Sequence, residues 1–526
     1  MWRELLNRNL QPRLLEACNV AVVAIGDSSY ECFNYAGKKL SNRLVQLGCH
    51  MLLPRADCDE RHPKGLAGAL DPWFQSLCQV LGKQAEVTSS AAPPAMLVDL
   101  PKYQRWMIQG QRALSDVIPG SWRGLEPFTC QVVNMQVLSP DDDPDTYLIE
   151  LSLPVEVVQR AGPSSVIALQ PQGSVADAQS FIEALQLQEE PEKNKNKNTS
   201  ELSALSSLSL LELFTSIVDI HAEVTRSWLE LLALHAMSPR HVSKLQFFCS
   251  LEGQEELYDY AGKWHRSIVD LTLDFQPYRP ASLPLSCVLA VLPRIRPREF
   301  SLLTTLDGKA TLLWKQVKMQ RNGVFHKLGL LTAQWMHPSL ALPLSHVAYL
   351  QPQGKLFFPS FHAPGGLEVE GLSFYFLCTG TGIASFISAI RRIPPTMPVH
   401  ILHGCRHPHV FAAWQKEFSD FSHITYTPAI SGVSSSSSSS NAKKVYVQHL
   451  LRQSGQATLL GSSLCHSLLE GRSLVYYSGA SKGAPTEIRQ AVIKNMADIL
   501  SCDEDAAARK LQQLAGQKRW QMEVWD

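Results

Sequence analysis

The chain alternates short apolar runs with runs of helical spacing, and one such pair flanks a cluster of glycines. Residues 372–378 (LSFYFLC) are almost wholly apolar, which predicts a strand buried on both faces of a parallel sheet. The turn Thr379 to Gly382 (TGTG) follows, and apolar residues at helical spacing continue from Ile383 to Ile390. Such a strand, glycine loop and helix let backbone N–H groups approach a phosphate. A purely structural turn gives the same pattern, so the glycines alone leave both interpretations open.

The beginning of the chain follows a similar scheme. Residues Asn19 to Ile25 predict a buried strand, which is followed by a polar loop, GDSSYECFN, at residues 26–34 and then by a helix. His50 to Pro54 predicts a second strand. Asp71 to Leu81 predicts a second helix, with Asp71 and Pro72 as its cap and first turn. The expected order is therefore β-α-β-α.

The middle of the chain changes its pattern twice. Residues 83–120 contain a Ser/Ala/Pro-rich stretch and predict a linker. Alternating strands are expected at Phe128 to Val137 and Thr146 to Leu153, and again at Phe300 to Leu303 and Thr311 to Met319. Helical spacing dominates residues 177–290, which also contain a polar stretch predicted to be disordered, EEPEKNKNKNTS. The pattern predicts a β domain that a helical insert interrupts.

Composition excludes several classes of function. Lys+Arg and Asp+Glu both total 48, so the formal net charge of +0 favours neither a nucleic-acid partner nor a membrane surface. The 12 cysteines are scattered without metal-ligand spacing, which predicts no metal site and favours a reducing compartment. The start MWRELLNRNL has no apolar signal core, and no run approaches a membrane span. We therefore expect a soluble cytoplasmic protein, and the length of 526 residues predicts roughly three domains.

A second group of residues has the chemistry to hold a flavin dinucleotide. Arg298 on a strand can bind a pyrophosphate with two hydrogen bonds, and Phe300 shares its face and can lie along a flavin ring. The adjacent Ser301 can hydrogen-bond the flavin N5. Gly329 to Thr332 follows, where a glycine turn and a hydroxyl at a helix start can bind the same pyrophosphate. A plain strand with a solvated arginine is the alternative.

These two stretches resemble the R-x-[YF]-S and G-x-x-[ST] motifs of the ferredoxin-NADP reductase and cytochrome P450 reductase superfamily. The segment Tyr260 to Asp274 resembles the one whose arginine contacts the flavin; alignment places His265 there, so Arg266 beside it is the expected substitute. The resemblance implies an FAD site formed by Arg266, Arg298, Glu299, Phe300, Ser301, Gly329, Leu330, Leu331, Thr332 and Trp525.

The resemblance extends to the glycine loop and the residues after it. LCTGTGIASF is similar to the family's G-P-G-T-G-V-A-P-F loop, with Ser385 in place of the proline. Gly404-Cys405-Arg406 and Lys443 to Gln448 (KKVYVQ) match the family's G-C-R and K-x-Y-V-Q motifs. Gly432 stands where the family has arginine, so we expect a weakened preference for NADPH. An NADP site is implied at Thr381, Arg406, Ser431, Gly432, Lys444, Val445, Tyr446, Val447 and Gln448. A solvated loop is the alternative for Arg406.

The chain end and the first loop complete the resemblance. RWQMEVWD is similar to the family's C-terminus, in which an indole covers the flavin; this implies catalytic roles for Trp525 and Glu523 together with Ser301. A frayed terminus is the alternative. Ala480 replaces a polar residue of the family.

The loop at residues 26–34 resembles an FMN loop, which implies contacts from Gly26, Asp27, Tyr30, Phe33 and Asn34. Because a flavodoxin fold needs five parallel strands, we expect a truncated FMN domain with weak or no FMN binding.

Taken together, the order of these motifs identifies the chain as a member of the diflavin reductases. The implied architecture is α/β and β multidomain: a partial flavodoxin-like segment (1–82), a linker (83–120), an FAD-binding β-barrel with a helical insert (121–345) and a Rossmann-like NADP-binding domain (346–526). The resemblance implies electron flow from NADPH to FAD to FMN and on to an anamorsin-type [2Fe-2S] protein in cytosolic iron-sulfur cluster assembly. An FAD-only NADPH dehydrogenase and a catalytically silent interaction protein are the alternatives.

Overall fold

In the computed structural model the described residues are 5, 10–26, 33–59, 62, 66–81, 122–139, 145–187, 209–250, 252–279, 283–304, 310–321, 324–337, 340–359, 371–432, 444–481 and 483–525. The chain divides into two compact units. The first contains residues 1–119, 172–295 and 319–327, and the second contains residues 120–171, 296–318 and 328–526. The predicted linker, the polar stretch within the insert and the run of seven serines from Ser434 to Ser440 lie outside the described residues.

The N-terminal segment of the first unit is small and contains parallel strand pairs. Its elements are β1 (Asn19–Val20), β2 (Val23–Gly26), α2 (Tyr35–Gln46), β3 (His50–Met51), β4 (Ala56–Asp59) and α3 (Ala67–Val80). β1 pairs with β3, and β2 pairs with β4, both in parallel. The strand expected from Asn19 to Ile25 is therefore two short strands with different partners, and β4 was not predicted.

Helix α3 also corrects an expected boundary. The prediction began this helix at Asp71 with Pro72 in its first turn, whereas α3 begins at Ala67 and contains Pro72. Proline removes one backbone donor but does not stop the preceding alanine-rich residues from forming a turn. The Trp73 indole N–H donates to the Pro54 carbonyl at 2.7 Å, which fixes the helix against the segment's loop.

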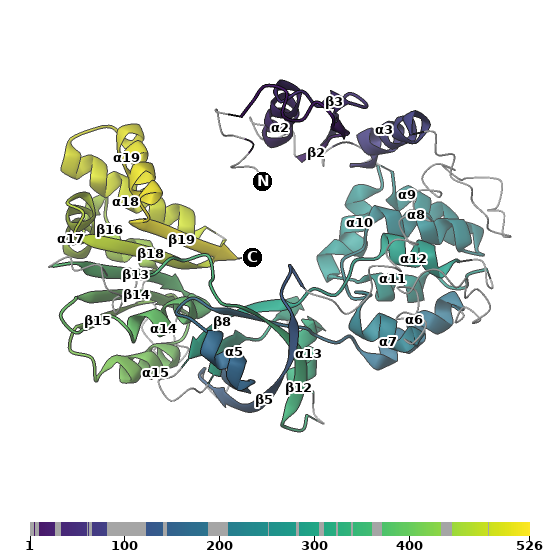
Figure 1. The fold of residues 1–526 in the computed structure, drawn as a ribbon. Coiled ribbons are helices and arrows are strands. Elements are labelled where there is room, and N and C mark those ends of the chain that lie inside the picture. Colours follow the sequence, from purple (N-terminus) through teal and green to yellow (C-terminus); the bar gives the residue numbers. More distant parts are fainter. Residues whose placement is uncertain are drawn as a thin grey trace. The chain divides into compact units, whose positions relative to one another are not determined.

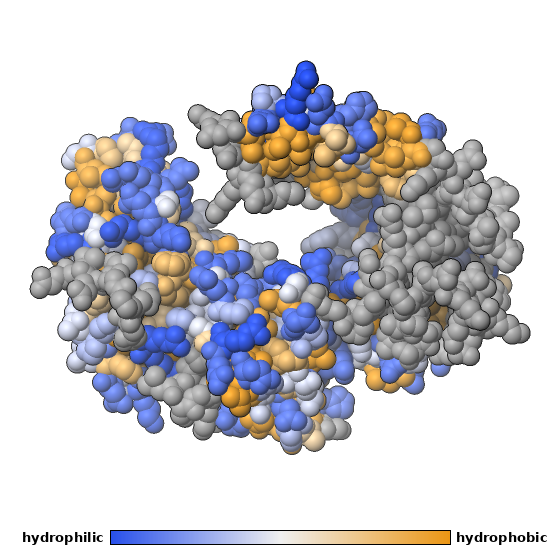
Figure 2. Space-filling model, in the orientation of Figure 1, coloured by the Kyte–Doolittle hydropathy of each residue, from blue (hydrophilic) through white to orange (hydrophobic). Residues whose placement is uncertain are grey.

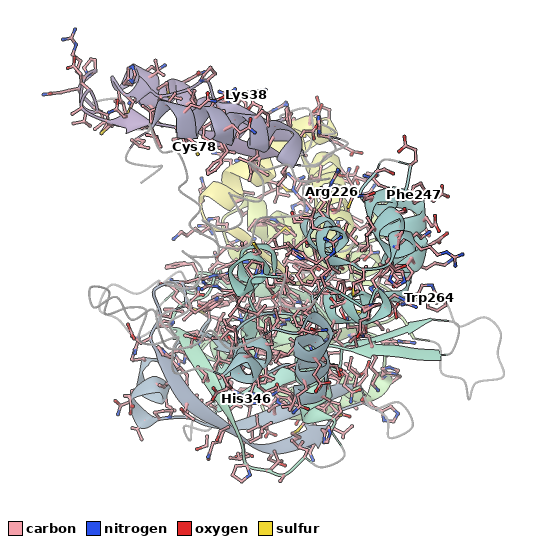
Figure 3. The ribbon with its side chains drawn as sticks, turned by 90° about the vertical axis from the view of Figure 1, so that its right-hand side faces the viewer. Lys38, Cys78, Arg226, Phe247, Trp264 and His346 are labelled. Atoms are coloured by element: carbon pink, nitrogen blue, oxygen red, sulfur yellow. The ribbon has the colours of Figure 1, made fainter. Side chains whose placement is uncertain are left out.

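Apart from residues 319–327, which belong to a β-hairpin, the rest of the first unit is helical, as the spacing predicted for the insert. It contains α6 (Val175–Leu185), α7 (Leu210–Ser216), α8 (Arg226–His235), α9 (Pro239–Phe248), α10 (Gln254–Tyr260), the short 3-10 helix η3 (Gly262–Trp264), α11 (Ile268–Asp274) and α12 (Leu285–Val291). Aromatic and leucine side chains form its core, in which Phe181 packs against Phe214 and Trp228. Figure 3 labels Arg226 on α8, and Phe247 and Trp264, which belong to the same helical part.

The second unit begins with a closed antiparallel barrel. Its strand order is β12-β5-β6-β9-β8-β7, and β7 pairs with β12 to close it. The elements are β5 (Pro127–Val137), β6 (Thr146–Ser152), α5 (Val155–Arg160), β7 (Val166–Leu169), β8 (Arg298–Thr304), β9 (Ala310–Lys315), α13 (Leu330–Trp335) and β12 (Leu344–Gln351). Trp335 fills the barrel core and donates its indole N–H to His346, labelled in Figure 3, at 3.0 Å. The hairpin β10 (Lys318–Arg321) and β11 (Val324–Leu328) joins β9 to α13.

A five-stranded parallel sheet follows, in the order β15-β14-β13-β18-β19 (Figure 1). The strands are β13 (Ser373–Thr379), β14 (Val399–Cys405), β15 (Ile424–Ile430), β18 (Ser473–Ala480) and β19 (Trp520–Trp525). The connecting elements are η4 (Gly380–Ile383), α14 (Ala384–Ile390), α15 (Pro408–Phe418), α16 (Val447–Leu451), β16 (Arg452–Gln453), β17 (Gln456–Ala457), α17 (Leu459–Leu469), α18 (Ala484–Leu500) and α19 (Glu504–Gly516).

The central strand of this sheet confirms the prediction of burial on both faces. Phe374 and Phe376 enter the core that contains α14 and α15, whereas Tyr375 and Leu377 enter the core beneath α17, α18 and α19. The strand order changes direction between β13 and β18, and crevices that bind ligands form at such points, at the carboxyl ends of the strands. Among the helices that the structure describes, none has the length and apolar character needed to cross a bilayer.

Candidate functional site

The glycine loop after β13 lies against the carboxyl end of β18. Gly380 has a φ of +55°, a backbone conformation that favours glycine. A Cβ at Gly382 would lie 2.1 Å from the Ser478 carbonyl oxygen, so a side chain there would displace the loop from the strand. The side chain of the predicted NADP residue Thr381 is half-buried in this turn. The loop is therefore fixed at the crevice, where a nucleotide would bind.

Below this loop lies a buried histidine that sequence reasoning did not identify. One ring nitrogen of His403, Nε2, lies 2.8 Å from the Gly380 carbonyl oxygen, and Nδ1 lies 2.6 Å from the Tyr426 hydroxyl. A neutral imidazole satisfies both groups by donating to the carbonyl and accepting from the hydroxyl. Burial lowers the pKa of His403 to about 4, and the hydrogen bond to Gly380 opposes that shift. His403 is therefore neutral near pH 7 and supports the loop.

A cleft of about 570 Å³ opens beside the loop. Its lining includes Thr379 and Gly380 from the loop, Arg406 from the end of β14 and Tyr446 and Gln448 from the start of α16. The exposed Arg406 supplies a permanent positive charge, which suits a phosphate ligand. The cleft therefore combines backbone donors, a cation and an aromatic ring, a set that fits a dinucleotide.

Two of the predicted NADP residues shape the cleft through their backbone. Gly432 N–H donates to the Arg406 carbonyl at 3.1 Å, and a Cβ at Gly432 would lie 2.1 Å from that oxygen. Ser431 donates its N–H to the Cys405 carbonyl at 3.0 Å. The family arginine that Gly432 replaces would therefore not fit this backbone without a shift. The close approach of the Arg406 carbonyl thus favours glycine at this position.

The K-x-Y-V-Q residues surround the start of α16. Lys444 and Tyr446 are exposed, whereas Val447 is buried against the sheet. Val445 N–H donates to the Ile430 carbonyl at 3.0 Å and continues the edge of β15. The Gln448 amide donates to the carboxylate of Glu487 in the first turn of α18. Glu487, which was not predicted, brings a negative charge to the cleft.

Four polar side chains from four elements meet beside the glycine loop. The Ser301 hydroxyl of β8 lies 2.8 Å from the Ser385 hydroxyl of α14. Ser478 at the end of β18 donates to the same Ser385 oxygen at 3.0 Å. The Glu523 carboxyl of β19 lies close enough to the Ser385 hydroxyl for that hydroxyl to lower its pKa. The structure thus brings Ser301 and Glu523, two of the predicted catalytic residues, into one cluster and adds Ser385 and Ser478.

The electrostatics of Glu523 follow from its position. Burial raises the pKa of the Glu523 carboxyl above its ordinary value. The nearby Glu299 adds to that increase, while Lys355 and the Ser385 hydroxyl oppose it. Desolvation penalises the charged carboxylate, and the opposing contacts only partly compensate. The carboxyl is therefore easier to protonate than an exposed glutamate.

The chain end is part of the sheet. β19 pairs in parallel with β18, with Ser478 opposite Glu523 and Ala480 opposite Trp525. The Ser481 N–H donates to the Trp525 carbonyl at 2.7 Å. The described terminus is therefore an ordered edge strand that places Trp525, half-buried, at the carboxyl end of the sheet. Its role as a flavin lid stays a prediction.

The predicted FAD residues on β8 point to alternate sides of the barrel wall. Phe300 stacks on Trp335 of α13, with ring centroids 6.4 Å apart. The Glu299 carboxylate pairs with Arg123 at 2.7 Å. Arg298 donates to the Arg296 carbonyl at 2.5 Å, which leaves further guanidinium donors for a ligand. Because side chains alternate along a strand, Arg298 and Phe300 share one face and Ser301 lies on the other.

The G-x-x-[ST] stretch forms the start of α13. Gly329 donates to the Val317 carbonyl at 2.9 Å, and the buried Thr332 hydroxyl accepts from the Val317 N–H at 3.0 Å. Leu330 is half-buried, and Leu331 is buried in the barrel core. The Thr332 oxygen is thus engaged with the backbone, although its hydroxyl hydrogen can still donate.

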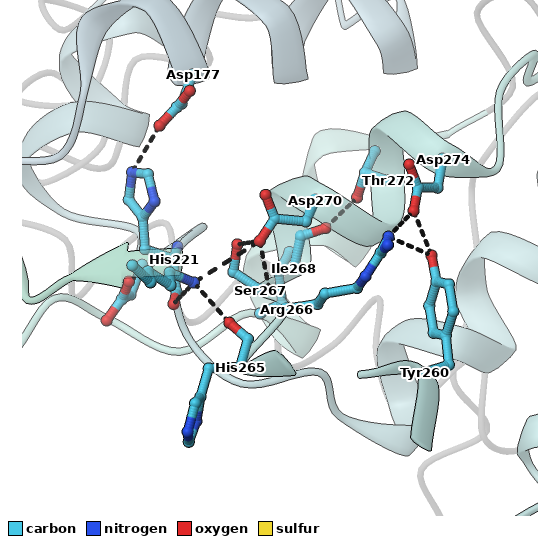
Figure 4. Close-up of polar contacts among 12 residues, drawn as sticks. Asp177, His221, Tyr260, His265, Arg266, Ser267, Ile268, Asp270, Thr272 and Asp274 are labelled. Carbon is cyan, nitrogen blue, oxygen red and sulfur yellow. Dashed lines mark hydrogen bonds and ion pairs between the residues drawn. The ribbon is translucent and has the colours of Figure 1, made fainter. Parts of the chain in front are cut away.

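The structure places Arg266 in an acidic and aromatic environment (Figure 4). Its guanidinium pairs with the Asp274 carboxylate and lies 4.5 Å from the centroid of the Tyr260 ring. The Tyr260 hydroxyl donates to Asp274 at 2.5 Å. His265, the strictly aligned position, has a φ of +50° and a carbonyl that accepts from Lys327 at 3.3 Å. Arg266 therefore already has a carboxylate partner, and its flavin role stays a prediction.

The predicted FMN residues are only partly described. Asp27 and Tyr30 lie outside the described residues. Gly26 and Asn34, at the two ends of the loop, approach closely, since a Cβ at Gly26 would lie 2.5 Å from Asn34 Oδ1. The buried Asn34 donates to the Cys58 carbonyl at 3.4 Å, and its Oδ1 has no partner among the described residues. Phe33 contacts the Lys38 ammonium at 5.5 Å. A buried acceptor that is unpaired among the described residues fits a ligand donor.

Three residues of the site escaped sequence reasoning for different reasons. Ser478 comes directly before Gly479, and its residue type alone does not distinguish it from any other serine in a strand. His403 belongs to an apolar strand, where a buried structural histidine is the ordinary interpretation. Glu487 would have been found from its position in the first turn of a helix that begins in a glycine-rich loop.

Comparison with known proteins identifies the class. The family model described as FAD binding domain matches residues 124–306, which include strands of the barrel, and the flavodoxin model matches residues 1–73. Together with the parallel sheet and its cleft, these matches define a flavoprotein oxidoreductase with FAD and FMN domains.

Similar proteins then define the family. NADPH-dependent diflavin oxidoreductase 1 of Bos taurus is 29% identical over 551 residues, covering 100% of this chain and 88% of the relative. The proteins of the same name from Mus musculus and Arabidopsis thaliana are 27% and 26% identical, with the same coverage. The chain is thus similar over its whole length to NADPH-dependent diflavin oxidoreductases, and it is an NADPH-dependent flavoprotein oxidoreductase.

Proposed function

We propose that this chain oxidises NADPH and transfers the electrons through FAD and FMN to an iron-sulfur protein of the anamorsin type, in cytosolic iron-sulfur cluster assembly. The observation that carries the proposal is the cluster of Ser301, Ser385 and Glu523 beside the glycine loop and its cleft. The flavin supplies the chemistry when bound, because it accepts a hydride and releases electrons one at a time. The partner and the cytoplasmic compartment rest on the family resemblance of the sequence.

The residues of the cleft account for binding of the nicotinamide nucleotide. Arg406 binds a phosphate, and Lys444 with Tyr446 binds the adenosine 2′-phosphate that distinguishes NADPH from NADH. Gln448 and Glu487 face the same cleft and suit ribose hydroxyls. Glu487 also opposes phosphate binding, in agreement with the weakened NADPH preference expected from Gly432.

On the flavin side, each residue orients the reacting ring or controls a proton. Arg298 binds a phosphate of FAD, and Ser301 presents its hydroxyl to the flavin N5. Glu523 would hold or release a proton beside a bound flavin, and Trp525 would cover the flavin and exclude water from it. Gly329 and Thr332 support the phosphate end from the start of α13.

Single-turnover reduction of the FAD-loaded chain tests this function. K444Q should raise KM for NADPH about tenfold and leave KM for NADH unchanged, because one charge-assisted phosphate bond is lost. R406Q should raise KM for both nucleotides if it binds the shared phosphates. K416Q, an exposed lysine on α15, is the matched charge control. Absence of NADPH-dependent bleaching in the wild type would refute the proposal.

A second candidate function is an FAD-only NADPH dehydrogenase that reduces dyes. The exposed apolar side chains of β2 favour it, because an open strand face weakens an FMN domain. Reduction of ferricyanide without reduction of a purified anamorsin-type [2Fe-2S] protein would support this candidate. Reduction of both would support the full electron route.

A further inference from the structure

The outer face of β9 is directed toward the parallel sheet. Leu312 and Trp314 belong to the barrel core, whereas Leu313 between them packs in the core that contains Phe374 of β13. Because side chains alternate along a strand, Lys315 extends from the same face as Leu313. Lys315, the last residue of β9, therefore lies on the side of the barrel that faces the sheet.

This lysine is one of the residues that line the nucleotide cleft. The lining includes Lys315 together with Thr379, Gly380 and Arg406. β9 also contacts η4, the short helix formed by the glycine loop. Among the lining residues that the structure describes, Lys315 and Arg406 are the two that carry a permanent positive charge. They reach the cleft from different elements, and no sequence motif contained Lys315.

An ion pair holds the Lys315 ammonium at the wall of the cleft. Its Nζ lies 3.1 Å from Oδ2 of Asp145, whose side chain is 13% exposed. The other Asp145 carboxylate oxygen accepts from the Thr146 hydroxyl at 2.6 Å, and the Asp145 carbonyl accepts from the Gln316 N–H at 2.7 Å. The carboxylate is thus fixed on the barrel, and it limits the positions that the ammonium can take.

This pairing leaves Lys315 able to bind a ligand. An ammonium has three N–H donors, and the contact with Asp145 uses one of them. The Lys315 side chain is 50% exposed, so an anion in the cleft can approach the other two donors. A phosphate suits this position, because hydrogen bonds between two charged groups are stronger than those between neutral groups.

We propose that Lys315 is a nucleotide-binding residue that contacts the pyrophosphate of the nicotinamide nucleotide from the barrel, while Arg406 contacts it from the parallel sheet. The inference rests on the proposed function, since it takes the cleft to hold NADPH. The pyrophosphate is assigned because β9 contacts the glycine loop, whereas the residues proposed for the 2′-phosphate lie at the start of α16. NADPH and NADH share the pyrophosphate, so Lys315 strengthens the binding of both without selecting between them.

The test is a calorimetric titration of the full chain without flavin, with NADP⁺ and NAD⁺ as probes. K315Q should bind both nucleotides roughly threefold to tenfold more weakly, because one charge-assisted contact is lost. K315R, which keeps the charge, should restore most of the affinity. Adenosine 2′-monophosphate, which lacks the pyrophosphate, should bind equally to K315Q and the wild type. K318Q is the matched control, because Lys318 of β10 is exposed and does not line the cleft.

A further variant separates nucleotide binding from the structural effect of the ion pair. D145N removes the ion pair but keeps the Lys315 ammonium, so it should bind NADP⁺ and NAD⁺ at least as tightly as K315R does. Equal weakening in D145N and K315Q would assign the effect to the ion pair and overturn the inference. Equal affinities of K315Q and K318Q for both nucleotides would also overturn it.

A second readout uses the FAD-loaded chain. K315Q should raise KM for NADPH and KM for NADH by the same factor, whereas K444Q should change their ratio. A rise for NADPH alone would contradict the assignment to the pyrophosphate. A wild type that binds neither nucleotide and is not reduced by NADPH would refute the proposed function, and the role of Lys315 with it. That outcome is distinct from a wild type that binds both while K315Q is unaffected.

Discussion

Two regions of the chain carry similar apolar strand patterns but differ in how the strands are covered. In the parallel sheet of the second unit, β13 lies between β14 and β18, and its side chains enter a core on each face. In the N-terminal segment, β2 buries Ala24 but leaves Val23 36% and Ile25 60% exposed. Figure 2 shows apolar side chains gathered on the surface of this segment. Packing by surrounding elements, more than local sequence, decides how rigidly a strand holds its loop.

The largest expected difference between the two regions is in flavin retention. Purified chain should keep about one FAD and lose FMN during gel filtration, because the loop after β2 extends from a strand with one open face. Heat release and chromatography of the flavins measure both. Added FMN should bind again with lower affinity than FAD. Equal amounts of tightly held FAD and FMN would show that the open face does not weaken the FMN loop.

Truncation of an apolar side chain should lower the free energy of unfolding much more in the parallel sheet than in the N-terminal segment. F376A removes a fully buried ring of β13 and should cost about 3–5 kcal/mol, whereas I25A should change the free energy of unfolding by less than about 0.5 kcal/mol. Hydrogen exchange followed by mass spectrometry reports each strand separately. Loss of protection should appear at residues 373–379 in F376A and stay small at residues 19–26 in I25A. A large effect of I25A would show that another element covers Ile25.

Acid should lower the stability of the parallel sheet and its glycine loop, because the neutral form of His403 supports that loop. Its pKa of about 4 in the folded chain lies below the ordinary 6.5, so the unfolded chain binds the proton more readily. The stability that neutral His403 contributes is present above pH 6.5 and is lost as the pH falls through 4. The full loss amounts to about 3 kcal/mol of the free energy of unfolding.

Thermal unfolding of the second unit between pH 7 and pH 4 measures this loss. H403Q, which cannot titrate, should show a flatter dependence over that interval but a lower stability at pH 7, because a buried amide cannot reproduce both hydrogen bonds. H409Q, an exposed histidine on α15, is the control. An unchanged pH dependence in H403Q would contradict a role for His403 in acid sensitivity.

The elements that were predicted correctly have a strong pattern of apolar residues in the sequence. The run at residues 372–378 predicted β13 to within one residue, because a strand buried on both faces excludes polar side chains. The sequence predicted one strand from Asn19 to Ile25, whereas the structure has two, β1 and β2. Their separate pairing with β3 and β4 depends on residues that are distant in the sequence. The start of α3 was misplaced because Pro72 suggested a first turn.

The candidate site was predictable where residue type and spacing carried the chemistry. Ser301 and Glu523 could be proposed from motifs, but the hydrogen bonds of Ser385 to Ser301 and Ser478 could not, because they depend on the approach of α14 to β8 and β18. Arg266 illustrates the opposite case, in which a suitable cation already pairs with Asp274. Sequence indicates which side chains are present, whereas their hydrogen-bond partners depend on the tertiary structure.

The smallest predicted effect concerns stability within the site itself. Burial raises the pKa of Glu523, so its contribution to stability is present at low pH and is lost as the pH rises through the folded pKa. At a pH above that pKa the site therefore holds a poorly solvated carboxylate. E523Q keeps the size of the side chain without its charge and should raise Tm at pH 7 by roughly 1–3 °C, although it removes the proton-holding group.

The pH dependence of this gain distinguishes its cause. The difference in Tm between E523Q and the wild type should shrink as the pH falls and the wild-type carboxyl becomes protonated. E504Q, a change in the first turn of α19 on the surface, provides the matched charge control and should show no such gain. A gain in E523Q that is independent of pH would assign the effect to packing. A gain that disappears at low pH would mean that the ionisable group beside Ser385 lowers the stability of this end of the sheet. The open N-terminal strands do not share this cost.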